Sequence, residues 1–295
     1  TSAAATRATS RSWLVRANNP SPMTLDGTNT WVLVEPGERV AVVIDPGPDD
    51  ASHRAAVLAA VASAGATEVA LVLLTHGHPD HADGAPPFAD AVAAPIRAVA
   101  PSFCSAATQP LVDGEQLRFG GLRLDVVATP GHTADSVCFV LGADAALLTG
   151  DTVLGRGSTV VAYPDGRLRD YLQSLRRLRA LADERQLRVV LPGHGPVVDD
   201  PAALLEQYAS HREMRLAQVR TAAVGAHTID DVLHAVYGDV EPSLQFAARW
   251  SLLAQLEYLR ESGVDLAGLG LLGPPAQPLD VPDDDGPRFD AQPPA

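Results

Sequence analysis

Short apolar runs alternate with turn-rich segments over the first two hundred residues of the chain. Seven of these runs predict β-strands, because each is rich in Val, Leu and Ile and is bounded by Gly, Pro or Asp. They cover residues 31–34, 40–44, 69–74, 122–127, 137–141, 145–149 and 187–191. Many short strands with helices at intervals predict a layered α/β architecture.

Helical periodicity interrupts these strands. Residues 51–64 are rich in Ala after a Pro-Asp-Asp start, and residues 169–183 place Tyr and Leu on one face with arginines off it. No GxGxxG or GxxxxGK[ST] loop opens either helix, so no nucleotide-binding loop is predicted. Beyond residue 200 the pattern predicts helices alone, at residues 201–222, 228–237 and 243–261.

This change of pattern predicts a domain boundary. We expect a sheet domain over residues 13–200 and a helical domain over residues 201–272. Residues 1–12 are mainly Ala, Ser and Thr without the apolar segment of a secretory signal, and we expect a disordered start there. Residues 273–295 are rich in Pro and Asp, which predicts a disordered acidic tail.

Composition narrows the functional classes. No run of about 18 apolar residues is present, so we expect neither a membrane span nor a membrane partner. Two cysteines, Cys104 and Cys138, are too few for a disulfide framework, which favours a reducing, cytoplasmic location. The formal charge is −14 and all 22 basic residues are arginine, a balance that disfavours polyanion binding and favours small-molecule substrates.

A dense group of metal-binding side chains follows one predicted strand. The strand at residues 69–74 leads into Thr-His-Gly-His-Pro-Asp-His, which delivers His76, His78, Asp80 and His81. His76 and His78 are two residues apart on a chain that leaves a strand, so they can share one metal ion. Asp80 and His81 lie on the next turn and can address a second ion. Three of the nine histidines fall in this segment, a density that predicts a metal site.

Three further candidate ligands follow later strands. His132 lies in Thr-Pro-Gly-His-Thr, Asp151 in Thr-Gly-Asp-Thr and His194 in Pro-Gly-His-Gly. A glycine beside each ligand permits close approach of the backbone and unusual dihedral angles. Hydrolytic zinc sites use three or four protein ligands and keep one position open to water, so these residues complete a suitable donor set.

The His-x-His-x-Asp-His segment, together with the three downstream ligands, resembles the metallo-β-lactamase fold superfamily. The resemblance covers roughly residues 25–200 and implies an αββα sandwich with two zinc ions at one edge. It implies two ligand sets and one bridging residue: His76, His78 and His132 for one zinc, Asp80, His81 and His194 for the other, and Asp151 between them.

Three other segments sharpen the resemblance. Val-Ile-Asp-Pro-Gly at residues 43–47 is similar to a second-strand motif of the superfamily, which implies that Asp45 lies behind the ligands. Residues 18–34 and 208–215 are similar to the beta-lactamase-like protein 2 group. This group carries a winged-helix-like C-terminal domain and includes an animal mitochondrial single-strand endoribonuclease and fungal polyketide thioesterases. The implied fold class is an α/β metallo-β-lactamase sandwich with a small helical winged-helix-like C-terminal domain.

The resemblance implies a dinuclear zinc hydrolase with Asp80 and Asp151 in the catalytic centre. Two zinc ions lower the pKa of a shared water, and the resulting hydroxide can attack a thioester, an ester, a lactone or a phosphodiester. The acidic balance and the absence of lysine favour a small-molecule thioester or ester. A bridging Asp151 argues against β-lactam turnover, because antibiotic-hydrolysing relatives generally lack such a residue.

Two alternative functions remain open. The resemblance favours a single-strand endoribonuclease acting on RNA, as does the segment 165–188, in which seven arginines and four acidic residues give a charge of +3. The second alternative is a non-catalytic binding module, although all seven metal-ligand candidates are present.

One helical segment supplies candidate substrate-binding residues. His211, Arg212 and Arg215 lie near one face of a predicted helix and can present donors to an anionic substrate group. The other interpretation is a solvated helix face. The sequence does not predict the oligomeric state.

Overall fold

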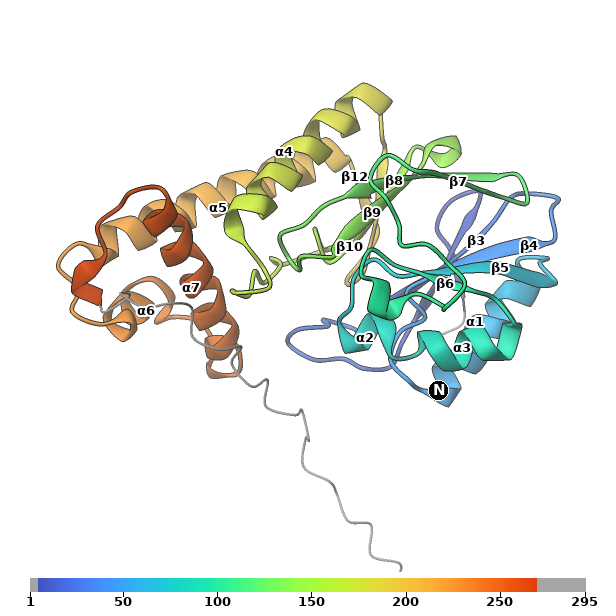
Figure 1. Ribbon diagram of the computed structural model, residues 1–295, viewed down its shortest axis with the longest axis horizontal. Helices are drawn as coiled ribbons and strands as arrows, with labels where there is room; N and C mark the ends of the chain where they lie inside the picture. The colour runs from blue at the N-terminus through green and yellow to red at the C-terminus, as the bar shows by residue number, and fades with distance from the viewer. Residues whose placement is uncertain (1–4, 270–295) are drawn as a thin grey trace, which may run out of the picture.

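The computed structural model describes residues 5–269, in which two six-stranded sheets pack against each other (Figure 1). The first sheet has its strands in chain order: β1 (Thr6–Arg7), β2 (Ser12–Arg16), β3 (Asn29–Val34), β4 (Val40–Ile44), β5 (Glu68–Leu73) and β6 (Ile96–Arg97). The second runs in reverse chain order: β12 (Val198–Asp199), β11 (Val189–Pro192), β10 (Ala146–Gly150), β9 (Val137–Leu141), β8 (Leu122–Ala128) and β7 (Gln116–Phe119).

Helices cover the outer faces of both sheets (Figure 1). Three lie on the first sheet: α1 (Ala51–Ser63), α2 (Pro79–Ala82) and α3 (Ala85–Val92). The others lie on the second sheet or beyond it: α4 (Leu168–Arg185), α5 (Pro201–Ala223), α6 (Ile229–Tyr237) and α7 (Gln245–Glu261). Short 3-10 turns join these elements: η1 (Pro101–Phe103), η2 (Gly142–Asp144), η3 (Pro242–Leu244) and η4 (Ala267–Leu269).

The strands alternate between two cores. In β3, Trp31 and Leu33 face the second sheet, whereas Val32 and Val34 face the helices α1 and α3. Successive side chains of a strand point to opposite faces, so a strand buried on both faces becomes apolar at every position. This explains the continuous apolar runs in the sequence and makes the sheet domain an αββα sandwich.

The seven predicted strands and five predicted helices are confirmed. The strands correspond to β3, β4, β5, β8, β9, β10 and β11, and the helices to α1, α4, α5, α6 and α7. The sequence analysis missed β1, β2, β6, β7 and β12, together with α2 and α3.

The expectation of a disordered start over residues 1–12 is wrong for the described residues. Strand β1 pairs with β2, and Arg11 donates to Glu35 and to Asp144 at 2.6 Å each. Thr9 also donates to Asp144. These contacts tie the segment to both sheets. The predicted acidic tail at residues 273–295 lies outside the described residues.

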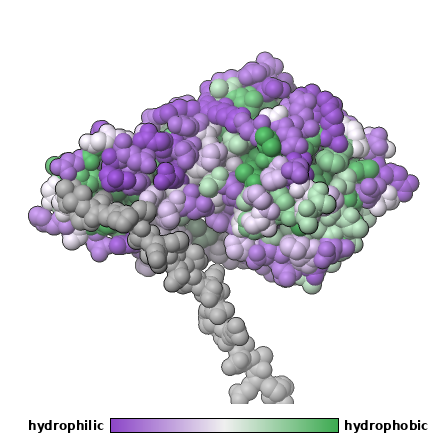
Figure 2. Space-filling model, viewed as in Figure 1, coloured by the Kyte–Doolittle hydropathy of each residue, from purple (hydrophilic) through white to green (hydrophobic). Residues whose placement is uncertain are grey.

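The C-terminal helices form a core of their own on the end of α5. Val219, Val232, Leu252 and Leu256 are buried together there. In Figure 2, hydrophilic side chains cover much of the visible outer surface over α4 and the C-terminal helices, so the apolar faces of these helices are turned inward. Within residues 5–269, no helix has the length and apolarity needed to cross a membrane.

Candidate metal centre

The seven candidate ligands lie at one edge of the sandwich, beyond strand ends. The segment at residues 76–81 follows β5, and the other three ligands follow β8, β10 and β11. Strand β9 is antiparallel to both β8 and β10, and β10 is parallel to β11. Strands β8, β10 and β11 therefore end at the same edge of the second sheet, and this topology gathers ligands that are far apart in the sequence.

The donor atoms form three overlapping groups, and within each group all ligand atoms lie within 4.8 Å of one another. The groups are His76, His78 and His132; His76, His81 and Asp151; and Asp80, His81 and His194. The first and third groups coincide with the two ligand sets that the resemblance implies. The second group places Asp151 next to both sets.

Unsatisfied donor atoms in the cluster fit a bound metal. Among the described residues, His76 Nε2 and Asp151 Oδ1 are buried without a hydrogen-bond partner, which is costly unless something else satisfies them. His81 Nε2 lies 3.2 Å from His194 Nε2, so two imidazole nitrogens face each other. Imidazole nitrogens and carboxylate oxygens are the donors that hydrolytic zinc sites use. The residues present therefore suit a metal centre.

Charges are strongly coupled on the aspartate side of the cluster. Burial opposes the charged form of His81, but Asp80, Asp151 and Asp45 outweigh burial and raise the pKa of His81 well above its ordinary value. Burial also opposes charge on Asp151, yet His194 and His81 hold the pKa of this carboxyl well below its usual range. Buried carboxylates that stay ionised favour a cation between them.

The other side of the cluster favours neutral imidazoles. Burial, together with neighbouring His81 and His78, holds the pKa of His76 well below its ordinary value. Burial and His78 lower the pKa of His132 to about 4. Neutral imidazole is the form that binds a metal, so no proton has to leave His76 or His132 at neutral pH.

Asp45 holds His81 from behind. Its Oδ2 accepts hydrogen bonds from His81 Nδ1 at 2.9 Å and from Thr75 Oγ1 at 2.7 Å, and its Oδ1 accepts from the Thr75 backbone N–H at 2.8 Å. The φ of Asp45 is 50°, a left-handed conformation that persists only when surrounding contacts enforce it. Asp45 thereby directs Nε2 of His81 into the cluster.

Two more ligands are oriented through their outer nitrogen. His76 Nδ1 lies 3.0 Å from Thr75 Oγ1, which itself donates to Asp45. His132 Nδ1 lies 2.7 Å from the carbonyl oxygen of Val160. Each arrangement fixes the ring so that Nε2 faces the other ligands. The role of Val160 has no sequence signal, because any residue provides a carbonyl.

The segment before β3 closes another side of the cluster. Thr28 Oγ1 donates to Asp80 Oδ2 at 2.8 Å, and the carbonyl of Gly27 lies 3.3 Å from His194 Nδ1. The Asn29 side chain donates to two carbonyl oxygens of the loop that carries His194. Sequence reasoning used this segment for the resemblance alone and missed these contacts. A run of small polar residues before a buried strand was the available signal.

Gly193 shows why glycines stand beside the ligands. A Cβ added there would lie 2.4 Å from Asp151 Oδ1 and 2.7 Å from His81 Cε1, closer than real contacts permit. The loop can therefore approach the cluster only without a side chain at this position. The expectation of close backbone approach is confirmed here.

The three predicted substrate-binding residues come together at one cavity. His211, Arg212 and Arg215, all on α5, line a space of about 230 Å³ beside residues 158–160. Arg212 is only 6% exposed, donates to the carbonyl of Thr159 and lies over the ring of Tyr171, 5.0 Å from its centroid. Arg212 is thus packed between α5 and the sheet domain rather than displayed on a helix surface.

Comparison with known proteins identifies the class. The model of the family described as "Metallo-beta-lactamase superfamily" matches residues 23–194. The chain therefore belongs to that superfamily, most of whose members are metal-dependent hydrolases. It is 33% identical over 241 residues to the "Atrochrysone carboxyl ACP thioesterase" of Aspergillus fumigatus, covering 76% of this chain and 72% of the relative. It is 31% identical over 277 residues to a "Beta-lactamase-like protein 2 homolog" of Drosophila melanogaster, covering 88% and 91%.

Solved structures share the fold. A metallo-beta-lactamase family protein from Thermus thermophilus superposes with a TM-score of 0.71 at 26% identity, over 85% of this chain and 94% of the other. A beta-lactamase domain protein from Burkholderia ambifaria gives a TM-score of 0.74 at 22% identity, over 88% of each chain. The coverage extends beyond the sandwich, so these proteins share more than the metal-binding core.

Proposed function

We propose that this protein is a dinuclear zinc hydrolase that acts on a small-molecule thioester or ester. The observation that carries the proposal is the convergence of seven imidazole and carboxylate side chains around His76 Nε2 and Asp151 Oδ1, two buried atoms that make no hydrogen bond among the described residues. The thioesterase among the relatives supports the substrate class.

The two ligand sets suit two ions. His76, His78 and His132 would hold one ion, and Asp80, His81 and His194 the other. Asp151 would serve both sets: its Oδ1 lies 3.4 Å from His81 Nε2, and its Oδ2 lies 3.2 Å from His194 Nε2 and 3.8 Å from His132 Nε2. When bound, a pair of zinc ions supplies a water acidic enough to attack at neutral pH and polarises the substrate oxygen.

Asp80 and Asp151 have different tasks in this proposal. The Asp151 side chain is 12% exposed and sets the spacing between the ligand sets. The Asp80 side chain is 26% exposed and accepts a hydrogen bond from Thr28. Burial opposes its charge, but His81 and His194 hold its pKa well below the usual range, so it stays ionised as a ligand of the second ion on the accessible side of the cluster. His211, Arg212 and Arg215 would bind an anionic part of the substrate.

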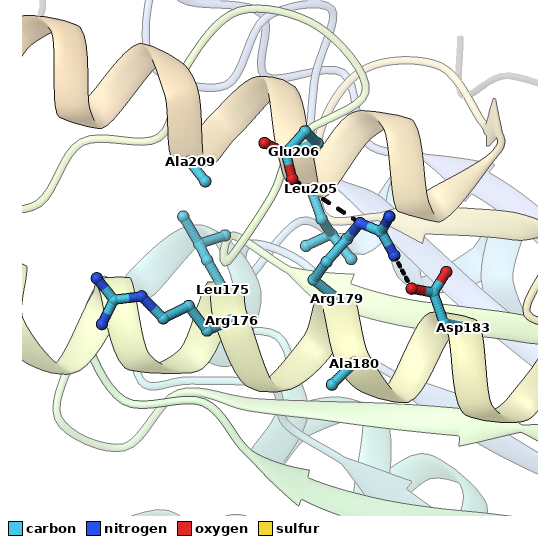
Figure 3. Close-up of a pocket in the computed structure, with 8 residues that line it drawn as sticks. All are labelled: Leu175, Arg176, Arg179, Ala180, Asp183, Leu205, Glu206 and Ala209. Carbon is cyan, nitrogen blue, oxygen red and sulfur yellow. Dashed lines mark hydrogen bonds and ion pairs between the residues drawn. The ribbon is translucent and has the colours of Figure 1, made fainter.

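The pairing of most α4 arginines with carboxylates favours an acyl substrate over RNA. Arg176 is the exception among the described residues of this helix. In the pocket between α4 and α5, Arg179 forms ion pairs with Asp183 and Glu206 (Figure 3). The other pairs along this helix are Arg167 and Arg169 with Glu261, Arg177 with Asp113, and Arg185 with Asp125 and Glu184. Single-strand binding needs arginines free along a groove, together with stacking aromatics.

The test is a paired substrate screen. Purified protein loaded with zinc is incubated with an aryl thioester and, separately, with a labelled single-stranded RNA, each with and without a chelator. We expect chelator-sensitive thioester hydrolysis and at least tenfold discrimination against RNA. Cleavage of RNA alone would replace the proposal with the endoribonuclease, and inactivity toward both substrates with two zinc ions bound would favour the non-catalytic binding module.

A further inference from the structure

A cavity separates the C-terminal helices from the sheet domain. Its volume is about 230 Å³, and one wall is the backbone segment at residues 158–160. Another part of the lining is apolar, with Leu244, Ala247 and Ala248 from η3 and the start of α7. A second space of about 280 Å³ adjoins it, since Ser158 and His211 line both.

The charge of this cavity is opposite to that of the chain. Of the residues lining it within the described range, two are arginine, one is histidine and none is acidic, although the chain carries a net −14. No ion pair joins Arg212 or Arg215 to a carboxylate among residues 5–269. A cationic wall without acidic partners in an acidic protein favours an anionic ligand.

The arginines keep hydrogen-bonding capacity. Arg212 is nine-tenths buried, and its Nε has no hydrogen-bond partner among the described residues. Arg215 donates from Nη1 to the carbonyl of Val236 and to Gln218 Oε1, both at 3.1 Å, and lies over the Tyr237 ring, 5.1 Å from its centroid. A planar guanidinium has five N–H donors, so these contacts leave donors available to a carboxylate or phosphate.

The cavity also borders the metal cluster through two hydrogen bonds. The carbonyl of Val160, which lines the cavity, lies 2.7 Å from His132 Nδ1. Thr159, its neighbour, donates from Oγ1 to the backbone carbonyl of Asp151 at 2.7 Å. A ligand in the cavity is thus separated from two metal-ligand candidates by a single stretch of backbone.

We propose that this cavity binds the distal end of the substrate's acyl group, which would reach it around the segment at residues 158–160, and that this end is an organic anion on an apolar chain. The inference rests on the proposed function and specifies its substrate class. The carboxylate or phosphate would bind to the Arg212–Arg215 wall, and the chain would pack on Leu244, Ala247 and Ala248. An acyl group with both features can contact the arginines and the apolar residues of the lining at once, whereas a neutral chain or a small anion satisfies only one of the two.

Binding without turnover tests the proposal directly. Titration calorimetry on the zinc-loaded protein would use hexanoate and hexyl phosphate, with 1-hexanol and acetate as probes that carry only one of the two features. We expect at least one six-carbon anion to bind at least tenfold more tightly than both single-feature probes. The tighter of the two anions shows whether the cavity prefers carboxylate or phosphate.

Substitutions in the cavity distinguish binding there from binding at the metal cluster. Arg215→Ala should abolish the tenfold preference, whereas Arg220→Ala, at an exposed position of the same helix outside the cavity, should retain it. Ala247→Phe, which fills the apolar wall without touching an arginine, should also weaken hexanoate binding at least tenfold. Equal hexanoate affinity in the wild type, Arg215→Ala and Ala247→Phe would overturn the proposal.

The failure of the cavity proposal and the failure of the hydrolase proposal give different results. Arginine-dependent binding of hexanoate with no hydrolysis of any thioester would leave the cavity assignment intact and remove the hydrolase. Thioester hydrolysis with equal kcat/KM for an adipoyl and a hexanoyl thioester would leave the hydrolase intact and overturn the cavity. We expect the adipoyl thioester, which ends in a carboxylate, to be preferred at least tenfold.

Discussion

We expect Asp151 to matter more for chemistry than for folding. Its two oxygens lie within 3.4 Å of His81 Nε2 and His194 Nε2, and it is close to both ligand sets. The carboxylate is surrounded by imidazoles instead of apolar side chains, so little hydrophobic packing depends on it. Its removal should disturb the metal spacing first.

We therefore expect Asp151→Ala to lower kcat at least ~100-fold while the free energy of unfolding changes by no more than ~2 kcal/mol. Steady-state kinetics and denaturant titration measure the two quantities. Asp90→Ala, at an exposed carboxylate on α3, is the matched control and should leave both unchanged. A kcat equal to that of the wild type would remove Asp151 from the catalytic centre.

His53 gives a residue-scale prediction on pH. It is buried, with Nε2 2.8 Å from Thr30 Oγ1 and with Nδ1 lacking a hydrogen-bond partner among the described residues. Burial lowers the pKa of His53 to about 4. Because the unfolded chain binds this proton near pH 6.5, the unfolded state holds more protons between pH 6.5 and 4, and stability falls as the pH drops through that window.

His53→Gln keeps a donor to Thr30 but cannot be protonated. We expect the wild type to lose on the order of 2–3 kcal/mol more than this variant between pH 7 and pH 4. Denaturant unfolding at several pH values measures the unfolding free energy of both proteins. Subtracting one from the other removes the losses that the other histidines cause in both. Parallel pH profiles would show that His53 does not titrate in the folded protein.

At the scale of elements, predictability follows burial. Strand β3 could be read from the sequence because both its faces are buried, which makes every position from Trp31 to Val34 apolar. The edge strands β1 and β12 have two residues each and are largely exposed, so their apolar pattern is too short to detect. Helix α2 has only four residues, of which two, Asp80 and His81, are metal-ligand candidates, so it is too short to show an apolar face in the sequence.

The same reasoning explains which parts of the site were predictable. His76 to His81 lie in one short segment, so their density alone indicates a metal site. The outer contact from Val160 is a backbone carbonyl and leaves no trace in residue type. Arg212 was predicted on the helix face that now lines the cavity, but helical periodicity does not reveal which neighbour buries a side chain.

The start of α5 provides the element-scale prediction. Asp200 caps this helix by accepting from the Ala203 backbone N–H at 3.0 Å, and its φ of 60° lies in the left-handed region. Asp200→Ala loses the cap and keeps the strain, so we expect a loss of ~1–2 kcal/mol of unfolding free energy. Asp200→Asn, which can cap and tolerates this conformation, should lose less than half of that. Denaturant titration of both variants measures their unfolding free energies. Equal losses for Asp200→Ala and Asp200→Asn would argue against the cap.

At the scale of the whole molecule, metal and fold should be coupled. The ligands come from both sheets, and burial opposes the charges on His81 and Asp151 when no cation is present. Anything that binds only the folded state stabilises it, by about 2.7 kcal/mol at a concentration 100 times the Kd. Metal content therefore bears on thermal stability as well as on activity.

We expect about two zinc ions per chain after dialysis, since seven ligands are present where one ion needs four. Exhaustive chelation should lower the Tm by ~5–10 °C, and zinc should restore it. Atomic emission analysis and calorimetric melting provide the measurements. A content clearly below one equivalent would contradict the dinuclear assignment, whereas iron or manganese in place of zinc would revise only the identity of the metal.

The C-terminal helices are joined to the sandwich by more than one contact. Leu204, Leu205 and Tyr208 of α5 belong to the core on the outer face of the second sheet, together with Ala254 of α7. The hydroxyl of Tyr208 accepts a hydrogen bond from the Leu154 backbone N–H at 2.9 Å. The predicted boundary at residue 200 thus separates two patterns in the sequence but cuts through one apolar core.

We expect a chain ending at residue 200 to lose cooperative unfolding or to aggregate, because the cut exposes the apolar face of α4 that α5 and α7 cover. A chain ending at residue 269 is the control and should melt like the full-length protein. Calorimetry and size-exclusion chromatography compare the three chains. If residues 1–200 unfold cooperatively at the Tm of the full chain, the sandwich is an autonomous domain and α5 contributes only to substrate binding. Loss of folding would instead show that α5 is part of the sandwich, so the cavity that α5 lines is fixed by the same core that holds the metal ligands.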